Sequence, residues 1–182
     1  MITATKKHNI FQDTTHRVSR LVPGHLPDFL IIGAQKSGTT GLFNLLKQHP
    51  DLRGSARKEI HFYSNDTIYA KGTSWYRDHF RSYGRYASRT PLLFEATPDY
   101  LYYPKSAERI ARDGKETKFI ILLRDPVKRA YSAWNMYRDW KARGKLPKLV
   151  YDDHIAGNKN NIHKELFSDQ EFPAFETCVE RE

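Results

Sequence analysis

The sequence predicts an α/β fold with a central, mainly parallel sheet and helices on both faces. Short runs rich in apolar residues occur at residues 29–32, 92–95 and 118–123, and the first, which has no polar alternation, is typical of a strand buried on both faces. Segments with helical spacing follow each run, at residues 39–49, 104–111 and 127–141. Because parallel strands need crossover connections, strands that alternate with helices favour such a sheet.

The first strand is expected at Phe29–Ile32, a continuous apolar run that Gly33 closes. A helical pattern opens at Thr39 and Thr40, with leucines that recur at three- and four-residue spacing. Pro50 ends this pattern, because proline disfavours a helical conformation in the residue before it. The chain from about residue 28 to residue 50 is therefore predicted to be strand, tight loop and helix.

Two more strand and helix pairs follow. Leu92–Glu95 is a short strand candidate, and Lys118–Leu123 is the strongest strand signal in the chain. The helices predicted after them, Pro104–Ala111 and about Val127–Lys141, begin with a proline at or just before the first turn, where helices tolerate it. Open parallel sheets bind ligands at the carboxyl ends of their strands, so loops at those ends are the places to look for a site.

The segments outside these elements are polar. Residues 1–27 are expected to form an irregular leader, and residues 142–171 a polar excursion between elements. Residues 172–182 carry the beginning of another helical pattern. We see no internal repeat and no low-complexity tract.

Composition limits the classes of function. The 182 residues carry a net charge of +9, which indicates either an anionic partner or simple solubility. Cys178 is the single cysteine, so no intrachain disulfide is possible, in keeping with a reducing compartment. Neither a signal peptide nor an apolar run long enough to cross a bilayer is visible. We therefore expect a soluble, cytoplasmic protein.

The loop Gly33–Thr40 has the composition of an anion site. Its glycines let backbone N–H groups turn inward, and the helix that follows adds the positive end of its dipole. Lys36 adds a full charge, and Ser37, Thr39 and Thr40 add hydroxyl donors. We favour a phosphate or sulfate site over the alternative, an ordinary glycine-containing turn with a solvated lysine.

The loop differs from the Walker A motif of nucleoside-triphosphate kinases and ATPases. In that motif lysine directly follows the last glycine, whereas here Thr39 follows Gly38 and Lys36 precedes it by two positions. The sequence also shows no clear magnesium-binding acid of the kind such enzymes use. A P-loop-like kinase is therefore disfavoured, although it stays open as an alternative.

A second anion site is predicted where the strand Lys118–Leu123 ends. Arg124 leaves the strand there, and its guanidinium suits phosphate. Ser132 lies eight residues further on, two turns into the predicted helix, and can reach the same anion if the helix packs alongside. The alternative is that Arg124 pairs with an acid such as Asp125. For Lys128 we favour a solvated helix face.

Six segments together resemble the sulfotransferases that use 3′-phosphoadenosine 5′-phosphosulfate (PAPS), with the closest likeness to the heparan sulfate glucosaminyl branch and its bacterial relatives. In chain order these segments are Phe29–Thr40, Lys58–Tyr63, Trp75–Tyr76, Phe94–Tyr100, Pro104–Ile110 and Leu123–Ser132. Each is weak alone, but the ordered set is specific. The resemblance implies a P-loop-like three-layer sandwich and in-line transfer of a sulfuryl group from PAPS to a carbohydrate hydroxyl or amine, with 3′-phosphoadenosine 5′-phosphate as product.

The resemblance also implies residue roles. The first loop binds the 5′-phosphosulfate end, where Lys36 stabilises the bridging oxygen as sulfate leaves. Arg124 and Ser132 hold the 3′-phosphate, and Glu59 is the candidate general base. The residues implied to bind the donor are Gln35, Lys36, Ser37, Gly38, Thr39, Thr40, Arg124 and Ser132.

Three residues are candidates for the acceptor pocket. His61 lies two residues from Glu59 and would point the same way on an extended segment, although a packed or surface histidine is an equal alternative. Trp75 and Tyr100 could stack on a sugar, but core packing is the commoner role of aromatic side chains. The histidines are scattered without partners at ligand spacing, so no metal site is predicted.

The chain departs from the family pattern in two ways. Ala96 stands where heparan-type enzymes commonly carry a lysine, so one basic contact is absent. The family also continues well past this length, so residues 28–182 are expected to be the N-terminal portion of a sulfotransferase domain that lacks its C-terminal part. A non-catalytic nucleotide or acidic-glycan binder of the same fold therefore stays open. Nucleic-acid binding rests on charge alone and is not expected, while the acceptor and the oligomeric state are left open.

Overall fold

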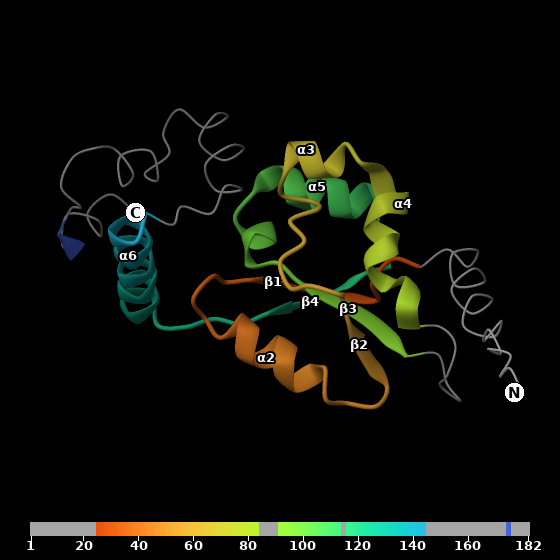
Figure 1. Ribbon diagram of the computed structural model, residues 1–182, viewed down its shortest axis with the longest axis horizontal. Coiled ribbons are helices and arrows are strands. Elements are labelled where there is room, and N and C mark those ends of the chain that lie inside the picture. The colour runs from red at the N-terminus through yellow and green to blue at the C-terminus, as the bar shows by residue number, and fades with distance from the viewer. Residues whose placement is uncertain (1–24, 84–90, 114–115, 145–173, 176–182) are drawn as a thin grey trace, which may run out of the picture.

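The structure is a computed structural model that describes residues 25–83, 91–113, 116–144 and 174–175. Most of the expected leader, most of the polar excursion and most of the expected C-terminal helix lie outside the described residues. What is described contains the sheet and every segment from which a site was predicted (Figure 1).

The described sheet has four parallel strands in the order β2-β3-β1-β4. The strands are β1 (Phe29–Gly33), β2 (Leu52–Gly54), β3 (Leu92–Ala96) and β4 (Lys118–Ile121). Leu30 of β1 pairs with Glu95 of β3 on one side and Phe119 of β4 on the other. The predicted α/β class with a parallel sheet is confirmed.

Helices cover both faces of this sheet, which gives three layers. Figure 1 shows α2 on one face, α3, α4 and α5 on the other, and α6 beyond the ends of β1 and β4. The helices are α2 (Thr39–Leu46), α3 (Asp66–Tyr69), α4 (Gly72–Arg77), α5 (Pro104–Asp113) and α6 (Pro126–Ala142), with short 3-10 helices η1 (Asp78–Tyr83) and η2 (Pro98–Leu101). No described helix is both long enough and apolar enough to cross a membrane.

The core divides between the two faces because successive side chains of a strand point to opposite sides. Leu30 belongs to an aromatic-rich cluster with Phe62 and Tyr76, on the face that α3, α4 and α5 cover. Ile31 belongs to the cluster under α2, where the Phe43 and Phe94 rings meet edge to face at 5.3 Å. The prediction that the first strand is buried on both faces is confirmed.

The structure differs from the predicted elements in length and at one edge of the sheet. The helix α2 ends at Leu46 and not at Pro50, and a turn fills the interval. The strand β4 ends at Ile121 and has only one neighbour in the described sheet, so Phe119 is 51% exposed and Leu123 beyond it is 82% exposed. The apolar run therefore predicted the strand β4 correctly, but β4 is an edge strand whose side chains are largely exposed.

Candidate functional site

The site is built at the carboxyl edge of the sheet, where segments that follow the strands are tied together. The Ala34 N–H donates to the Leu122 carbonyl at 2.8 Å, which joins the segments after β1 and β4. The Glu59 N–H donates to the Ala96 carbonyl at 3.0 Å, which ties the segment after β2 to the end of β3. The segments that carry the predicted site residues therefore share one edge of the sheet, as expected for an open parallel sheet.

The loop between β1 and α2 makes a tight turn that needs its two glycines. A Cβ on Gly33 would lie 2.7 Å from the Leu101 Cβ, so only glycine lets η2 approach this closely. Gly38 has a φ of 94° and precedes α2, which begins without a side-chain cap and without an acid in its first turn. The hydroxyl oxygen of Ser37 is buried and has no hydrogen-bond partner among the residues that the structure describes. This loop therefore presents donors that are still free to bind an anion.

The second predicted anion segment contacts this loop directly. The Arg124 guanidinium donates to the Lys36 carbonyl at 3.1 Å. From α6, the Tyr137 hydroxyl donates to the Gln35 side-chain oxygen at 3.1 Å, and the Lys36 ammonium reaches the sulfur of Met136 at 3.6 Å. The structure thus brings together Lys36 and Arg124, which lie 88 residues apart in the sequence.

The helix α6 begins directly after Arg124 and Asp125. The Asp125 carboxylate accepts from the Lys128 N–H at 2.9 Å and caps the helix, and Pro126 occupies its first turn. The Lys128 side chain is exposed, as expected for a solvated face. Ser132 lies half-buried two turns along α6, and its contact with a shared anion stays a prediction.

Three of the predicted site residues have a left-handed backbone. Among the described non-glycine residues, positive φ occurs at Lys36 (65°), Glu59 (61°) and His61 (58°). This region is disfavoured for residues with a side chain, and residues held in it cluster at active sites and ligand clamps. The segment around Glu59 is therefore not extended, and the reason given above for His61 pointing with Glu59 is wrong, although the two side chains do approach each other.

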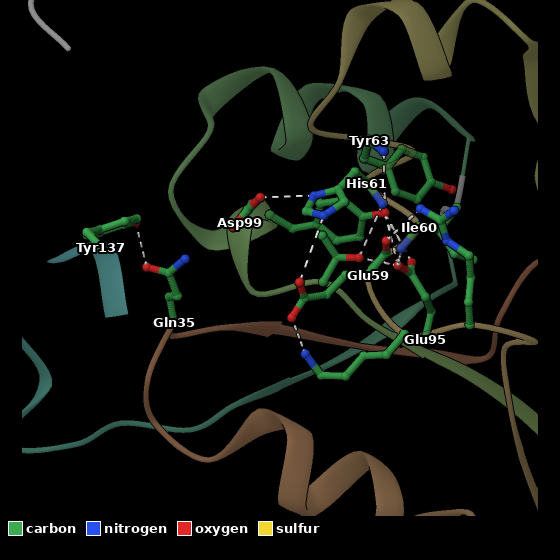
Figure 2. A network of polar contacts seen from close by, with 12 residues as sticks. Gln35, Glu59, Ile60, His61, Tyr63, Glu95, Asp99 and Tyr137 are labelled. Atoms are coloured by element: carbon green, nitrogen blue, oxygen red, sulfur yellow. Dashed lines mark hydrogen bonds and ion pairs between the residues drawn. The ribbon is translucent and has the colours of Figure 1, made fainter. Parts of the chain in front are cut away.

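His61 lies between two carboxylates, as Figure 2 shows. Its Nδ1 is 3.0 Å from an oxygen of Asp99, and its Nε2 is 3.9 Å from an oxygen of Glu59, which also pairs with Lys58. Burial acts to lower the pKa of His61, but the adjacent carboxylate of Asp99, with the charges of Glu59 and Glu95, outweighs burial and raises the pKa above 6.5. Within the described part of the chain, no group of three or more histidine, cysteine or acidic side chains is placed to hold a metal ion.

Glu95 of β3 is a buried carboxylate that bonds to the segment carrying Glu59 and His61. It was not singled out from the sequence. It accepts from the Tyr76 hydroxyl at 2.7 Å, from the Tyr100 hydroxyl at 3.1 Å, from the Ile60 N–H at 3.2 Å and from the Thr97 hydroxyl (Figure 2). Burial, followed by the charge of Glu95, raises the pKa of both tyrosines. The signal in the sequence was a glutamate inside an apolar strand, which must find partners if it is buried.

The two aromatic acceptor candidates have different surroundings. Tyr100 is buried, with its hydroxyl on Glu95 and its ring 5.5 Å from that of Tyr63, which favours the core alternative over stacking on a sugar. Trp75 is half-buried and its ring lies 4.7 Å from the Lys71 ammonium. A role for Trp75 in acceptor binding stays a prediction.

Comparison with known protein families shows the family to which the chain belongs. A family model described as the sulfotransferase domain matches residues 26–174. The chain belongs to the sulfotransferase family. The match begins just before β1 and includes every described element, so the family resemblance noted in the sequence is confirmed.

Several relatives agree with this assignment. The chain is 37% identical to the membrane-associated sulfotransferase kil1 of Dictyostelium discoideum over 85% of its own length and 30% of the relative's. It is 35% identical to the heparan sulfate glucosamine 3-O-sulfotransferase 5 of Mus musculus, over 72% of this chain and 38% of that one. It is also 35% identical to the mouse bifunctional heparan sulfate N-deacetylase/N-sulfotransferase 4, over 74% of this chain and 16% of that one.

A solved sulfotransferase shares the fold. The sulfotransferase from Alicyclobacillus acidocaldarius matches with a TM-score of 0.52 and 30% identity, over 67% of this chain and 53% of that one. The chain therefore spans about half of the solved sulfotransferase and well under half of the three curated relatives named above.

Proposed function

We propose that this chain carries the donor site of a PAPS-dependent sulfotransferase that transfers a sulfuryl group to a hydroxyl or amine of a carbohydrate. The observation that carries the proposal is the contact between Arg124 and the Lys36 loop. This contact joins two distant segments, each of which carries a cationic residue, at one edge of the sheet. PAPS has a phosphosulfate at one end and a 3′-phosphate at the other, and two adjoining cationic groups suit such a ligand.

The loop before α2 is proposed to bind the phosphosulfate end. The first N–H groups of a helix have no partner within the helix, and α2 begins without a side-chain cap. In the same loop, the Ser37 hydroxyl has no partner among the described residues, and Lys36 carries an ammonium that now lies against Met136 of α6. The residues present therefore fit an anionic group, with Gln35, Gly38, Thr39 and Thr40 completing the proposed cradle.

Arg124 and Ser132 are proposed to bind the 3′-phosphate. The Arg124 guanidinium is exposed and already lies against the backbone of the first loop. Its planar array of N–H groups can bond a carbonyl with one nitrogen and still offer others to a phosphate. Ser132 lies on the helix that begins two residues after Arg124 and would add a hydroxyl donor.

Glu59 is proposed as the general base. When PAPS is bound, it supplies an activated sulfuryl group, and the acceptor oxygen or nitrogen forms a bond to sulfur as the bond from sulfur to the bridging oxygen breaks. The acceptor's proton passes to the Glu59 carboxylate, and the electron pair of the broken bond stays on the phosphate. Lys36 stabilises the charge that develops there. The Glu59 side chain is 44% exposed, so an acceptor can reach it from solvent.

A carbohydrate is proposed as the acceptor because two of the relatives named above are described as acting on heparan sulfate. One difference from the heparan-type enzymes bears on how this chain would bind an acidic carbohydrate. Ala96 is completely buried and offers no charge where heparan-type enzymes commonly carry a lysine, so this chain needs another group to hold an acidic glycan. The same difference supports the second candidate, a member of the fold that binds the nucleotide without transfer.

The test is to follow thermal melting with 3′-phosphoadenosine 5′-phosphate or ATP·Mg²⁺, and then to measure transfer from labelled PAPS to heparan-type oligosaccharides. We expect the bisphosphate to raise the melting temperature more than ATP·Mg²⁺ does, and label to appear in the oligosaccharide. Binding without transfer would favour the non-catalytic candidate. A preference for ATP·Mg²⁺ would contradict the proposed donor.

Lys36→Ala separates binding from chemistry. We expect this variant to lose transfer by roughly 10²-fold or more, as expected when a donor to the developing charge is removed, and to keep part of its affinity for the bisphosphate. Lys47→Ala is the matched control, since Lys47 is an exposed lysine just after α2. Normal transfer by Lys36→Ala would show that Lys36 does not have the proposed role.

A further inference from the structure

His61 is held from two directions beside the proposed base. Its N–H lies 3.4 Å from the Thr97 hydroxyl, and its ring Nδ1 lies 3.0 Å from the Asp99 carboxylate. With Nδ1 beside Asp99, Nε2 on the other side of the ring lies 3.9 Å from the Glu59 carboxylate (Figure 2). The three side chains form a row, Asp99 to His61 to Glu59, in which Glu59 is the most exposed side chain.

The position of Asp99 follows from β3. Its neighbours Thr97 and Pro98 are both buried, and the Thr97 N–H donates to the Ile31 carbonyl at 3.1 Å. The short helix η2, with Pro98 in its first turn, then carries Asp99 toward His61. Asp99 is therefore fixed by the sheet, while Glu59 lies on a separate segment that follows β2. His61 lies against both Asp99 and Glu59 and so connects these two carboxylates.

The acidic groups around His61 indicate how the ring acts on Glu59. Acidic groups face His61 from three elements: Asp99 from η2, Glu59 from its own segment and Glu95 from β3. Together they favour the charged imidazolium over the neutral ring. A donor with several negative charges would disfavour another anion nearby, and an imidazolium beside Glu59 offsets that repulsion, together with Lys58.

We propose that Asp99 is a positioning residue for sulfuryl transfer: it holds the His61 ring in the orientation in which Nε2 faces Glu59, and so keeps the Glu59 carboxylate aimed at the acceptor. This inference rests on the proposed function. The proton that leaves the acceptor passes to Glu59, as above, while His61 keeps both of its ring protons and Asp99 stays a carboxylate. No group other than the donor and acceptor is consumed.

The row of side chains makes a specific prediction about pH. If the charged His61 is needed, transfer falls as the pH rises through the pKa of His61, which Asp99 helps to raise. In Asp99→Asn the carboxylate that opposes the effect of burial is gone, so the pKa of His61 falls. The alkaline limb of the kcat profile should therefore move to lower pH by about one unit or more, which is the size of shift that one adjacent opposite charge produces.

The experiment measures kcat and KM for PAPS across pH in the wild type, Asp99→Asn and Asp99→Glu, and the titration of the His61 ring by NMR in each. We expect Asp99→Asn to lower kcat at neutral pH by roughly tenfold, a part of what general-base catalysis contributes, with the KM for PAPS unchanged. Asp99→Glu keeps the negative charge, so the alkaline limb of its kcat profile should lie closer to that of the wild type than the limb of Asp99→Asn does. Asp139→Asn is the control, because Asp139 pairs with Arg143 on the surface of α6.

A double-mutant cycle separates positioning from a general structural effect. In a His61→Asn background, Asp99→Asn should have no further effect on kcat, since its action passes through the ring. An equal effect of Asp99→Asn with and without His61 would overturn the proposal. So would an unchanged His61 titration in Asp99→Asn, an outcome that is measured without turnover.

Failure of the proposed function would look different. If the wild-type chain neither bound 3′-phosphoadenosine 5′-phosphate nor transferred sulfate, the assignment of the donor site would be wrong and the catalytic part of the inference would fall with it. A shifted His61 titration in Asp99→Asn would still establish the coupling of the two side chains. The two results are independent, so each statement can be rejected separately.

Discussion

Lys36, Glu59 and His61 share a backbone conformation that is unfavourable for each of them. A left-handed φ costs a residue with a side chain about 1–2 kcal/mol relative to the ordinary helical region. The surrounding hydrogen bonds hold it in place, for example the bond from the Glu59 N–H to the Ala96 carbonyl. Glycine would fit these φ values without strain, but it has no ammonium, carboxylate or imidazole. The site therefore keeps its chemistry at a cost in stability.

This cost is measurable at Glu59. Glu59→Gly and Glu59→Ala both remove the carboxylate, but only glycine accepts a φ of 61° without strain. We expect the glycine variant to exceed the alanine variant by about 1 kcal/mol in free energy of unfolding, less the extra entropy of glycine in the unfolded chain. Urea denaturation checks this, and both variants should lose transfer. An alanine variant that is the more stable of the two would contradict the strain argument.

His61 also makes stability depend on pH. Because the pKa of the folded protein's His61 is raised above 6.5, its contribution to stability is fully present below that pH and is lost as the pH rises through the raised value. We expect the difference in free energy of unfolding between the wild type and Asp99→Asn to be largest at about pH 6 and to shrink toward about pH 9. A difference that stayed constant or grew across this range would show that the two side chains are not coupled in the folded state.

At the scale of elements, the sequence predicted long periodic segments and missed short ones. The helix α6 and the strands β1, β3 and β4 followed from apolar runs and helical spacing. The strand β2 has three residues and α3 has four, which is too short for any period to be visible. The role of Glu95 was hidden for another reason, since its partner Tyr76 lies 19 residues away and meets it only through the packing of α4 on β3.

The cap of α6 should affect ligand binding as well as the helix. Asp125→Ala removes the bond to the Lys128 N–H and should cost about 1 kcal/mol of stability, whereas Asp125→Asn keeps a side-chain acceptor and should cost little. Because Arg124 directly precedes the cap, the alanine variant should also weaken binding of 3′-phosphoadenosine 5′-phosphate. Urea denaturation and calorimetric titration test the two effects. Equal behaviour of both variants would show that the cap does not position Arg124.

At the scale of the whole molecule, the sheet brings together segments that the sequence keeps apart. The predicted meeting of Lys36 and Arg124 needs β1 and β4 to be neighbours, and the order β2-β3-β1-β4 makes them so. The same order places β3 on the other side of β1, so that Asp99 and Glu59 lie on that flank of the edge. Family resemblance predicted the roles of Lys36, Arg124 and Glu59. It did not predict Asp99 as the partner of His61, because that contact depends on where η2 begins.

The central claim is that the Lys36 loop and Arg124 bind opposite ends of one doubly phosphorylated adenosine. The most direct measurement compares, by calorimetric titration, the affinity of the wild type and Arg124→Ala for 3′-phosphoadenosine 5′-phosphate and for adenosine 5′-monophosphate, which lacks the 3′-phosphate. We predict that the wild type prefers the bisphosphate by roughly 10-fold or more, since a charge-assisted bond contributes about 1.5–3 kcal/mol, and that Arg124→Ala loses this preference. An Arg124→Ala variant that keeps the full preference would contradict the account.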